Sequence, residues 1–205
     1  MSQNPSNPSD DKPFHDESMR TLFAEMGRIA QARQQTLEIA VYGGSALALC
    51  FDWRTSTADI DYMPVRGAEA DIREIANEAA RNLGLPEDAL RPDVQIFASD
   101  FAKVAENGEY PKGMPEGMGL RVFIATPDYL LSMKLLSMRS SLETQDCRDV
   151  WHLIDETGVQ SVGEAMKRVA GFYPGQEVPI RHVRIAEDIF AAKARGESYS
   201  ATLGW

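Results

Sequence analysis

The sequence has few cysteines and no long apolar run, and each shortage excludes a class of protein. Its 205 residues include two cysteines, Cys50 and Cys147, and both fall in apolar helical patterns. Two such cysteines do not make the disulfide framework of a small secreted protein, so we expect buried thiols in a reducing, cytoplasmic compartment. No apolar run approaches the roughly 20 residues that span a membrane, and the N-terminus has no basic-then-apolar signal. The sequence therefore predicts no membrane association.

Basic residues are also in short supply, with 21 Lys and Arg against 31 Asp and Glu and a net charge of −10 at pH 7. Proteins that bind nucleic acid non-specifically generally need a basic surface to displace counterions. This chain has no Lys/Arg-rich stripe with interleaved aromatic residues, which argues against a long nucleic acid as substrate. The three histidines lack ligand spacing, and there is no catalytic triad, zinc motif, P-loop or internal repeat.

Residues that suit phosphate and metal chemistry are concentrated between Val41 and Pro64. A β-rich run stops at Gly43-Gly44-Ser45, a short apolar helix follows, and a second strand carries Asp59-Ile60-Asp61. Because alternate residues of a strand face one side, the two aspartates project together, and their repulsion favours a cation between them. Mg²⁺ suits hard oxygen ligands, while glycines and free amides at a helix start suit a phosphate. The structural alternative is a tight turn before a strand with an exposed acidic edge.

This segment resembles the signature of the nucleotidyltransferase superfamily related to DNA polymerase β. In that superfamily a Gly-Ser on the first helix precedes an acidic-hydrophobic-acidic strand; here Gly44-Ser45 is followed by thirteen residues and then Asp59-Ile60-Asp61. The resemblance implies that the two aspartates hold Mg²⁺ or Mn²⁺. A third carboxylate often lies on a neighbouring strand, and Asp93 is the candidate, although an ordinary turn aspartate would also stand there. The residues implied to bind the nucleotide in this segment are Gly43, Gly44, Ser45 and Thr57.

Two charged residues fall inside apolar stripes of the C-terminal half. At 100° per residue, Lys134 lies on the apolar side of a helix expected from Thr126 to about Arg139. Asp146 lies in the middle of the stripe of the next helix, and Asp149 lies at its margin. A buried charge needs a partner, so we expect either a Lys134–Asp146 ion pair joining the helices or two groups that face a nucleotide cleft. The two interpretations are compatible.

The run TPDYLLSMKLLSMR…QDCRDVWHLI resembles the C-terminal signature of the AbiEii-type branch of the same superfamily and of its uncharacterised bacterial relatives. There, a lysine on one helix and an aspartate in a following D-x-x-D helix accompany the glycine and aspartate motifs. The resemblance implies catalytic roles for Lys134, which would contact the nucleotide phosphates, and for Asp146, the distal acid. This chain departs from the branch in being short and strongly acidic, which puts a transfer-RNA substrate in doubt.

The patterns together predict an α/β (α+β) nucleotidyltransferase fold with a short, mixed, twisted sheet flanked by helices. We expect a disordered tail over 1–13, a catalytic domain over 14–125 with a strand at 93–97 and a loop at 106–119, and a C-terminal helical region over 126–205. The expected activity is Mg²⁺-dependent transfer of a nucleoside monophosphate from an NTP to a hydroxyl of RNA, protein or a small molecule. A toxin–antitoxin partner protein belongs to this interpretation. The alternatives are a non-catalytic nucleotide- or protein-binding module and an antibiotic-type small-molecule nucleotidyltransferase.

Overall fold

The computed structural model describes residues 14–92, 109–110, 119–139 and 145–199, which fall into two compact units. The N-terminal unit holds the described residues up to Ala125, and the C-terminal unit begins at Thr126. Within the described residues the chain forms a mixed β-sheet and helices, which confirms the expected α/β (α+β) class. The tail over 1–13 and the strand expected at 93–97 lie outside the described residues.

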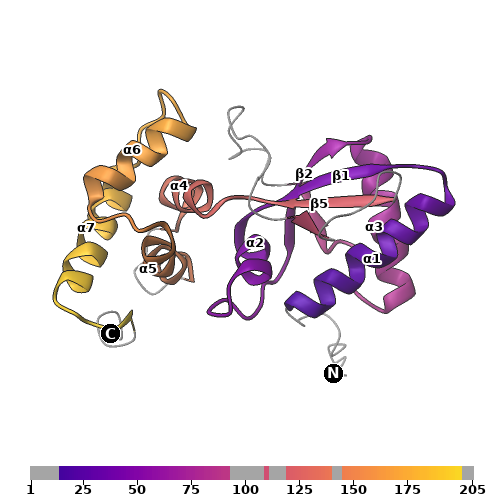
Figure 1. Cartoon of the computed structure of the whole chain (residues 1–205), viewed down its shortest axis with the longest axis horizontal. Helices are drawn as coiled ribbons and strands as arrows, with labels where there is room; N and C mark the ends of the chain where they lie inside the picture. Colours follow the sequence, from indigo (N-terminus) through magenta and orange to yellow (C-terminus); the bar gives the residue numbers. More distant parts are fainter. Residues whose placement is uncertain (1–13, 93–108, 111–118, 140–144, 200–205) are drawn as a thin grey trace, which may run out of the picture. The chain divides into compact units, whose positions relative to one another are not determined.

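The sheet of the N-terminal unit has the strand order β3-β2-β1-β5-β4, and Figure 1 labels its three longer strands, β1, β2 and β5. Its central strand β1 runs antiparallel to β2 and parallel to β5, while β3 is parallel to β2 and β4 is antiparallel to β5. The two-residue strands β3 and β4 were not expected, and β4 corrects the prediction of a loop throughout 106–119. The strands are β1 (Leu37–Val41), β2 (Ile60–Arg66), β3 (Leu90–Arg91), β4 (Glu109–Tyr110) and β5 (Leu120–Ile124).

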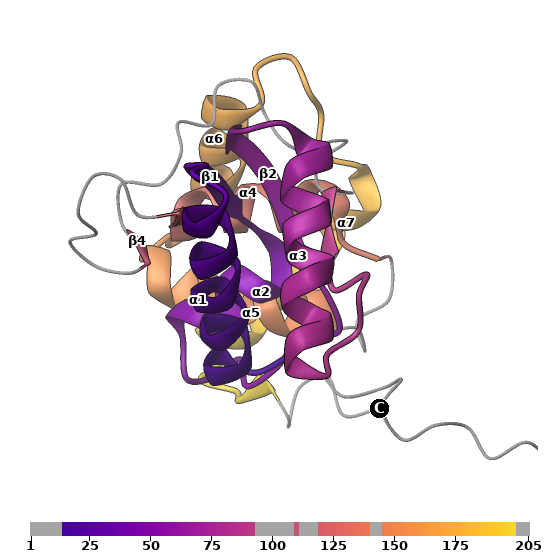
Figure 2. The same ribbon diagram turned by 90° about the vertical axis from the view of Figure 1, so that its right-hand side faces the viewer.

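Helices α1 (Asp16–Ala32) and α3 (Glu69–Leu83) lie side by side over one face of this sheet (Figure 2). Their apolar residues recur every three or four positions, so each helix buries one stripe. The buried side chains are Met19, Leu22, Phe23, Met26, Ile29 and Ala30 on α1, and Ile72, Ile75, Ala76, Ala79 and Ala80 on α3. Burial of these stripes anchors both helices to the sheet.

Helix α2 (Gly43–Cys50) continues directly from the end of β1 after a single residue, Tyr42. It is short and apolar, and six of its eight residues are buried. Cys50, its last residue, is exposed, which corrects the expectation of a buried thiol there, whereas Cys147 is buried as expected. Cys50 differs because it stands at the helix end, beyond the last buried turn.

The C-terminal unit consists of α4 (Pro127–Ser137), α5 (Gln145–Thr157), α6 (Val162–Phe172) and α7 (Ile180–Ala194). Helix α4 packs against the other three. Side-chain caps start two of the helices: Thr126 Oγ1 accepts from the Tyr129 amide at 3.3 Å, and Ser161 Oγ accepts from the Glu164 amide at 3.2 Å. Each cap satisfies an amide that has no intrahelical partner. None of the described helices has the length and apolar character needed to cross a membrane.

Candidate functional site

The register of β1 and β2 brings the two halves of the sequence motif together. Because these strands are antiparallel, the residue that ends β1, Val41, lies opposite Tyr62 near the start of β2. The amide of Tyr42 donates to the carbonyl oxygen of Asp61 at 3.0 Å. The glycines that open α2 and the aspartates at or just before the start of β2 are therefore neighbours in space, although up to eighteen positions separate them in the chain.

Gly43 and Asp61 form the tightest contact of this site. Gly43 has φ +59°, and a Cβ placed on it would lie 2.4 Å from Asp61 Oδ2. Only glycine adopts this left-handed conformation readily, and any side chain here would displace the carboxylate. On β2, Ile60 and Tyr62 are fully buried and Asp61 is half-buried. Strand alternation therefore turns Asp61 away from the buried residues beside it, toward the first turn of α2.

Gly44 borders a second group of polar side chains. A Cβ placed on it would lie 2.8 Å from Thr57 Oγ1 and 3.0 Å from Arg54 Nη2. The structure thus places Thr57 beside the glycine turn, where its predicted role in nucleotide binding stays a prediction, and adds Arg54, which the sequence did not indicate. An arginine beside the first turn of a helix places a positive charge where free backbone amides already favour an anion.

A phosphate contact was predicted for Ser45, but its hydroxyl lies in a buried, hydrogen-bonded environment. Its side chain is fully buried, and Oγ donates to the carbonyl oxygen of Tyr42 at 2.7 Å. In this arrangement the hydroxyl stabilises the turn between β1 and α2. Contact with a ligand would require the hydroxyl to leave this bond, so the phosphate role of Ser45 stays a prediction.

Asp59 stands one residue before β2 and pairs with an arginine from β3. Its Oδ2 lies 3.4 Å from Arg91 Nη1, with the aspartate side chain 34% exposed and the arginine 45% exposed. Arg91 is the register partner of Asp61, so it faces the same side of the sheet as both aspartates. Sequence analysis missed Arg91 because the strand that carries it is two residues long and shows no alternation.

The described part of this site offers two carboxylates for a metal. No group of three His, Cys, Asp or Glu side chains with metal-binding geometry occurs among the described residues, and the predicted third ligand, Asp93, lies outside them. Mg²⁺ commonly uses one or two carboxylates, with waters and substrate phosphates completing its six ligands. Asp59 and Asp61 therefore fit a Mg²⁺ site of that kind, and the absence of a side chain at Gly43 leaves the space that the Asp61 carboxylate occupies.

Lys134 and Asp146 belong to the C-terminal unit, where the predicted ion pair is present. Lys134 Nζ lies 2.7 Å from Asp146 Oδ1 and also 3.0 Å from Asp149 Oδ2. Asp149 is fully buried, while Lys134 and Asp146 are each 13% exposed. Asp149 was expected at the margin of the apolar stripe, and the structure shows that a side chain at this margin is fully buried. Asp146 also accepts hydrogen bonds from the amide and Nε of Arg139, at 3.2 Å and 3.1 Å.

These contacts shift the protonation equilibria of the pair. Burial lowers the pKa of the Lys134 ammonium, but the negative charges of Asp149 and Asp146 outweigh burial and leave this pKa above its ordinary value. Burial raises the pKa of the Asp146 carboxyl, but the positive charge and hydrogen bonds of Lys134, with those from Arg139, bring it down to about 2. Lys134 and Asp146 are therefore charged at neutral pH, and Lys134 already contacts two carboxylates.

Comparison of the chain with protein-family models, with curated proteins and with solved structures found no match. The roles discussed below therefore rest on the residues and their geometry.

Proposed function

We propose that the N-terminal unit catalyses Mg²⁺-dependent transfer of a nucleoside monophosphate from an NTP to a hydroxyl acceptor. The observation that carries this proposal is the contact between the Gly43 turn and Asp61, which joins a phosphate-binding helix start to a pair of metal-binding carboxylates. In the reaction, the acceptor oxygen forms a bond to the α-phosphorus, the bond from that phosphorus to the bridging oxygen breaks, and pyrophosphate leaves. The hydroxyl proton passes to water.

Asp59 and Asp61 are the residues that would hold the metal. Their oxygens are the hard ligands that Mg²⁺ and Mn²⁺ favour, and both side chains retain solvent access. When bound, Mg²⁺ supplies charge neutralisation at the α-phosphate and lowers the pKa of the acceptor hydroxyl. Without a metal, Arg91 partly offsets the negative charge of Asp59, whose Oδ2 lies 3.4 Å from Arg91 Nη1.

The triphosphate would bind at the first turn of α2. The first amides of a helix lack intrahelical partners, and the absence of a side chain on half-buried Gly44 would let phosphate oxygens approach them closely. Arg54, beside Gly44, adds a guanidinium that matches phosphate oxygens in geometry and charge. These groups stabilise the negative charge that develops on the leaving pyrophosphate.

The proposal rests on the N-terminal unit alone. The contacts of Lys134 with Asp146 and Asp149 are enough to account for the burial of all three side chains. Their assignment to the catalytic site stays a prediction.

One observation favours a non-catalytic nucleotide-binding module as the second candidate. Arg91 already lies 3.4 Å from Asp59, so part of the negative charge is neutralised without a metal. In that case an NTP would bind at the α2 turn through its phosphates and would not be cleaved. The two functions differ in whether a nucleotide is consumed.

The test is incubation of the protein with each α-labelled NTP and Mg²⁺, alone and with a cell extract, followed by detection of labelled product. We expect one NTP to label an acceptor and to release pyrophosphate, and Asp59→Asn with Asp61→Asn to abolish labelling. Glu74→Gln with Glu78→Gln is the matched control, because it removes two carboxylates paired with Arg33 outside the site. Mg²⁺-dependent NTP binding without any labelled product would favour the non-catalytic module.

A further inference from the structure

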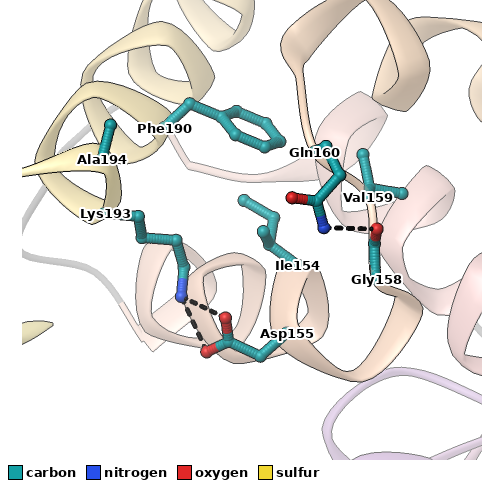
Figure 3. A pocket seen from close by; sticks show the side chains of 8 residues that line it. All are labelled: Ile154, Asp155, Gly158, Val159, Gln160, Phe190, Lys193 and Ala194. Carbon is teal, nitrogen blue, oxygen red and sulfur yellow. Dashed lines mark hydrogen bonds and ion pairs between the residues drawn. The ribbon is translucent and has the colours of Figure 1, made fainter. Parts of the chain in front are cut away.

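The C-terminal unit contains a pocket of about 360 Å³ that the proposed function does not use (Figure 3). It lies between the last turn of α5, the turn that follows, and the end of α7. Its volume is at the lower end of the range of ligand pockets, about 300–1,000 Å³. A pocket of this size accommodates a small molecule or one amino-acid-sized group, and its lining shows which chemistry it favours.

One wall is apolar and includes an aromatic ring. Ile154 and Val159 line the pocket from the α5 side, and the ring of Phe190 covers it from α7 (Figure 3). The face of an aromatic ring carries partial negative charge and attracts cations. This wall therefore suits a ligand with a short apolar body and, beside it, a positive charge.

The polar groups of the pocket that can form further hydrogen bonds are acceptors. Gln160 Nε2 donates to the carbonyl oxygen of Gly158 at 2.8 Å, and this bond directs Oε1 of the same side chain into the pocket (Figure 3). Across from it, the Asp155 side chain is 63% exposed. Both groups offer oxygen lone pairs to a donor.

Lys193, the basic residue that lines the pocket, already contacts Asp155 and Trp151. Its Nζ lies 2.7 Å from each carboxylate oxygen of Asp155 and 4.5 Å from the centroid of the Trp151 ring, and its side chain is only 16% exposed. A carboxylate has about four lone-pair sites, so Asp155 retains two after its bonds to Lys193. An anionic ligand would have to displace Asp155 from Lys193, whereas a cationic ligand would not.

Two helix ends add to the negative potential. Helix α5 ends at Thr157 and α7 ends at Ala194, and both ends border the pocket. Helix C-termini carry partial negative charge and stabilise cations within the last turn. The wall, the acceptors and the helix ends therefore all favour positive charge.

We propose that this pocket binds a small organic cation, an ammonium group on a short apolar body, through Asp155, Gln160 and the ring of Phe190. The ammonium donates to the free lone pairs of the carboxylate and the amide oxygen, and the apolar body packs on Ile154 and Val159. The proposal does not depend on nucleotidyl transfer, since none of these residues belongs to the N-terminal unit.

The test uses three probes of similar shape on the full chain at fixed ionic strength: cyclohexylammonium, cyclohexanol and cyclohexanecarboxylate. Titration followed by amide NMR should show saturable shifts at residues 158–160 and 190–194 with cyclohexylammonium. We expect this cation to bind at least about tenfold more tightly than the other two probes, as expected of a charge-assisted contact over an aromatic face. Tighter binding of the carboxylate, or no saturable shift with any probe, would overturn the proposal.

Two variants and one control test whether cyclohexylammonium binds in this pocket. Asp155→Asn and Phe190→Leu should each weaken binding of cyclohexylammonium about fivefold or more. Glu187→Gln removes a carboxylate that is paired with Arg184 on the same helix but does not line the pocket, and it should change affinity less than twofold. Equal loss in the Glu187 variant would show a general charge effect, and unchanged affinity in both pocket variants would place the cation elsewhere; either result contradicts the proposal.

Discussion

Each unit places two aspartates and a basic side chain close together. The two groups differ in how deeply they are buried and in how many carboxylates the basic side chain contacts. In the C-terminal unit, Lys134 contacts both Asp146 and Asp149, at 2.7 Å and 3.0 Å, and Asp149 is fully buried. In the N-terminal unit, Arg91 reaches Asp59 at 3.4 Å, and both of these side chains are about one third exposed or more.

The difference shows what each group can do. Buried charges have lost their water and must be neutralised within the chain, so the lysine of the C-terminal group is committed to its partners. Half-exposed carboxylates at the start of a strand keep contact with solvent, so a divalent cation can reach them without unfolding anything. We therefore interpret the C-terminal group as a stabilising one and the N-terminal group as the functional one.

The largest expected effect comes from breaking the buried group. Lys134→Met removes the cation beside buried Asp149 and leaves Asp146 with Arg139, and the loss of one partner of a buried pair costs roughly 3–5 kcal/mol of unfolding free energy. Urea unfolding followed by circular dichroism measures this loss. Arg168→Met, which breaks an exposed pair with Asp128 in the same unit, should cost no more than about 1 kcal/mol.

A rescue separates loss of charge balance from loss of packing. Adding Asp146→Asn and Asp149→Asn to Lys134→Met removes the unpaired charges and should recover more than half of the lost stability. If Lys134→Met alone stays within about 1 kcal/mol of the unmodified protein, the buried group does not stabilise the unit as described.

Acid should reduce the contribution of the same buried group to the unfolding free energy, by less than the loss expected for Lys134→Met. The pKa of Asp146 is lowered to about 2 in the folded chain, mainly by Lys134 against the opposing effect of burial, so its stabilising contribution is present above the ordinary value of 3.8. That contribution is lost as pH falls from about 4 toward 2, by roughly 2 kcal/mol. Unfolding free energies of the unmodified protein and of Asp146→Asn, measured between pH 7 and pH 2.5, should converge over this interval; parallel curves would be inconsistent with the ion pair.

At the N-terminal site, a glycine substitution should lower the unfolding free energy by a smaller amount and should strongly weaken Mg²⁺-dependent nucleotide binding. Gly43→Ala requires a side chain at φ +59°, which costs roughly 1–2 kcal/mol, and its Cβ would meet Asp61 Oδ2 at 2.4 Å. Gly84→Ala is a matched control, since Gly84 has φ +67° and nothing within 4 Å of an added Cβ.

Both glycine variants should lose similar stability in urea unfolding, and only Gly43→Ala should also lose Mg²⁺-dependent nucleotide binding. Retention of that binding in Gly43→Ala would show that the position of Asp61 does not matter for the site.

Local patterns were enough to indicate the helices and the longer strands β1 and β2. The apolar stripes span about three turns of α1 and about two turns of α3, and the start of α4 is marked by a capping threonine and a proline. The two-residue strands β3 and β4 were missed because two residues show no period. The burial of Asp149 was misjudged because helix angles give a face but not the depth of the groove against which that face packs.

The candidate site was only partly predictable because two of its residues reach it through contacts between segments that are distant in the sequence. The glycine turn and both aspartates lie within one segment, so their proximity follows from a strand, a helix and an antiparallel strand. Arg91 reaches the site only through the pairing of β2 with β3, and its position 32 residues after Asp59 gives no local signal. Arg54 lies in a polar turn whose path depends on how Thr57 pairs with Phe14 at the start of α1.

The central claim is that Asp59 and Asp61 hold a metal that nucleotide binding requires, and one titration tests it most directly. Calorimetric titration of each NTP with Mg²⁺ should show binding to the unmodified protein and to the Glu74→Gln/Glu78→Gln control. The Asp59→Asn/Asp61→Asn variant should bind at least about tenfold more weakly, with its unfolding free energy unchanged to within about 1 kcal/mol because the Arg91 pair is exposed. Equal affinity of that variant and the unmodified protein for the Mg²⁺–nucleotide would contradict the account.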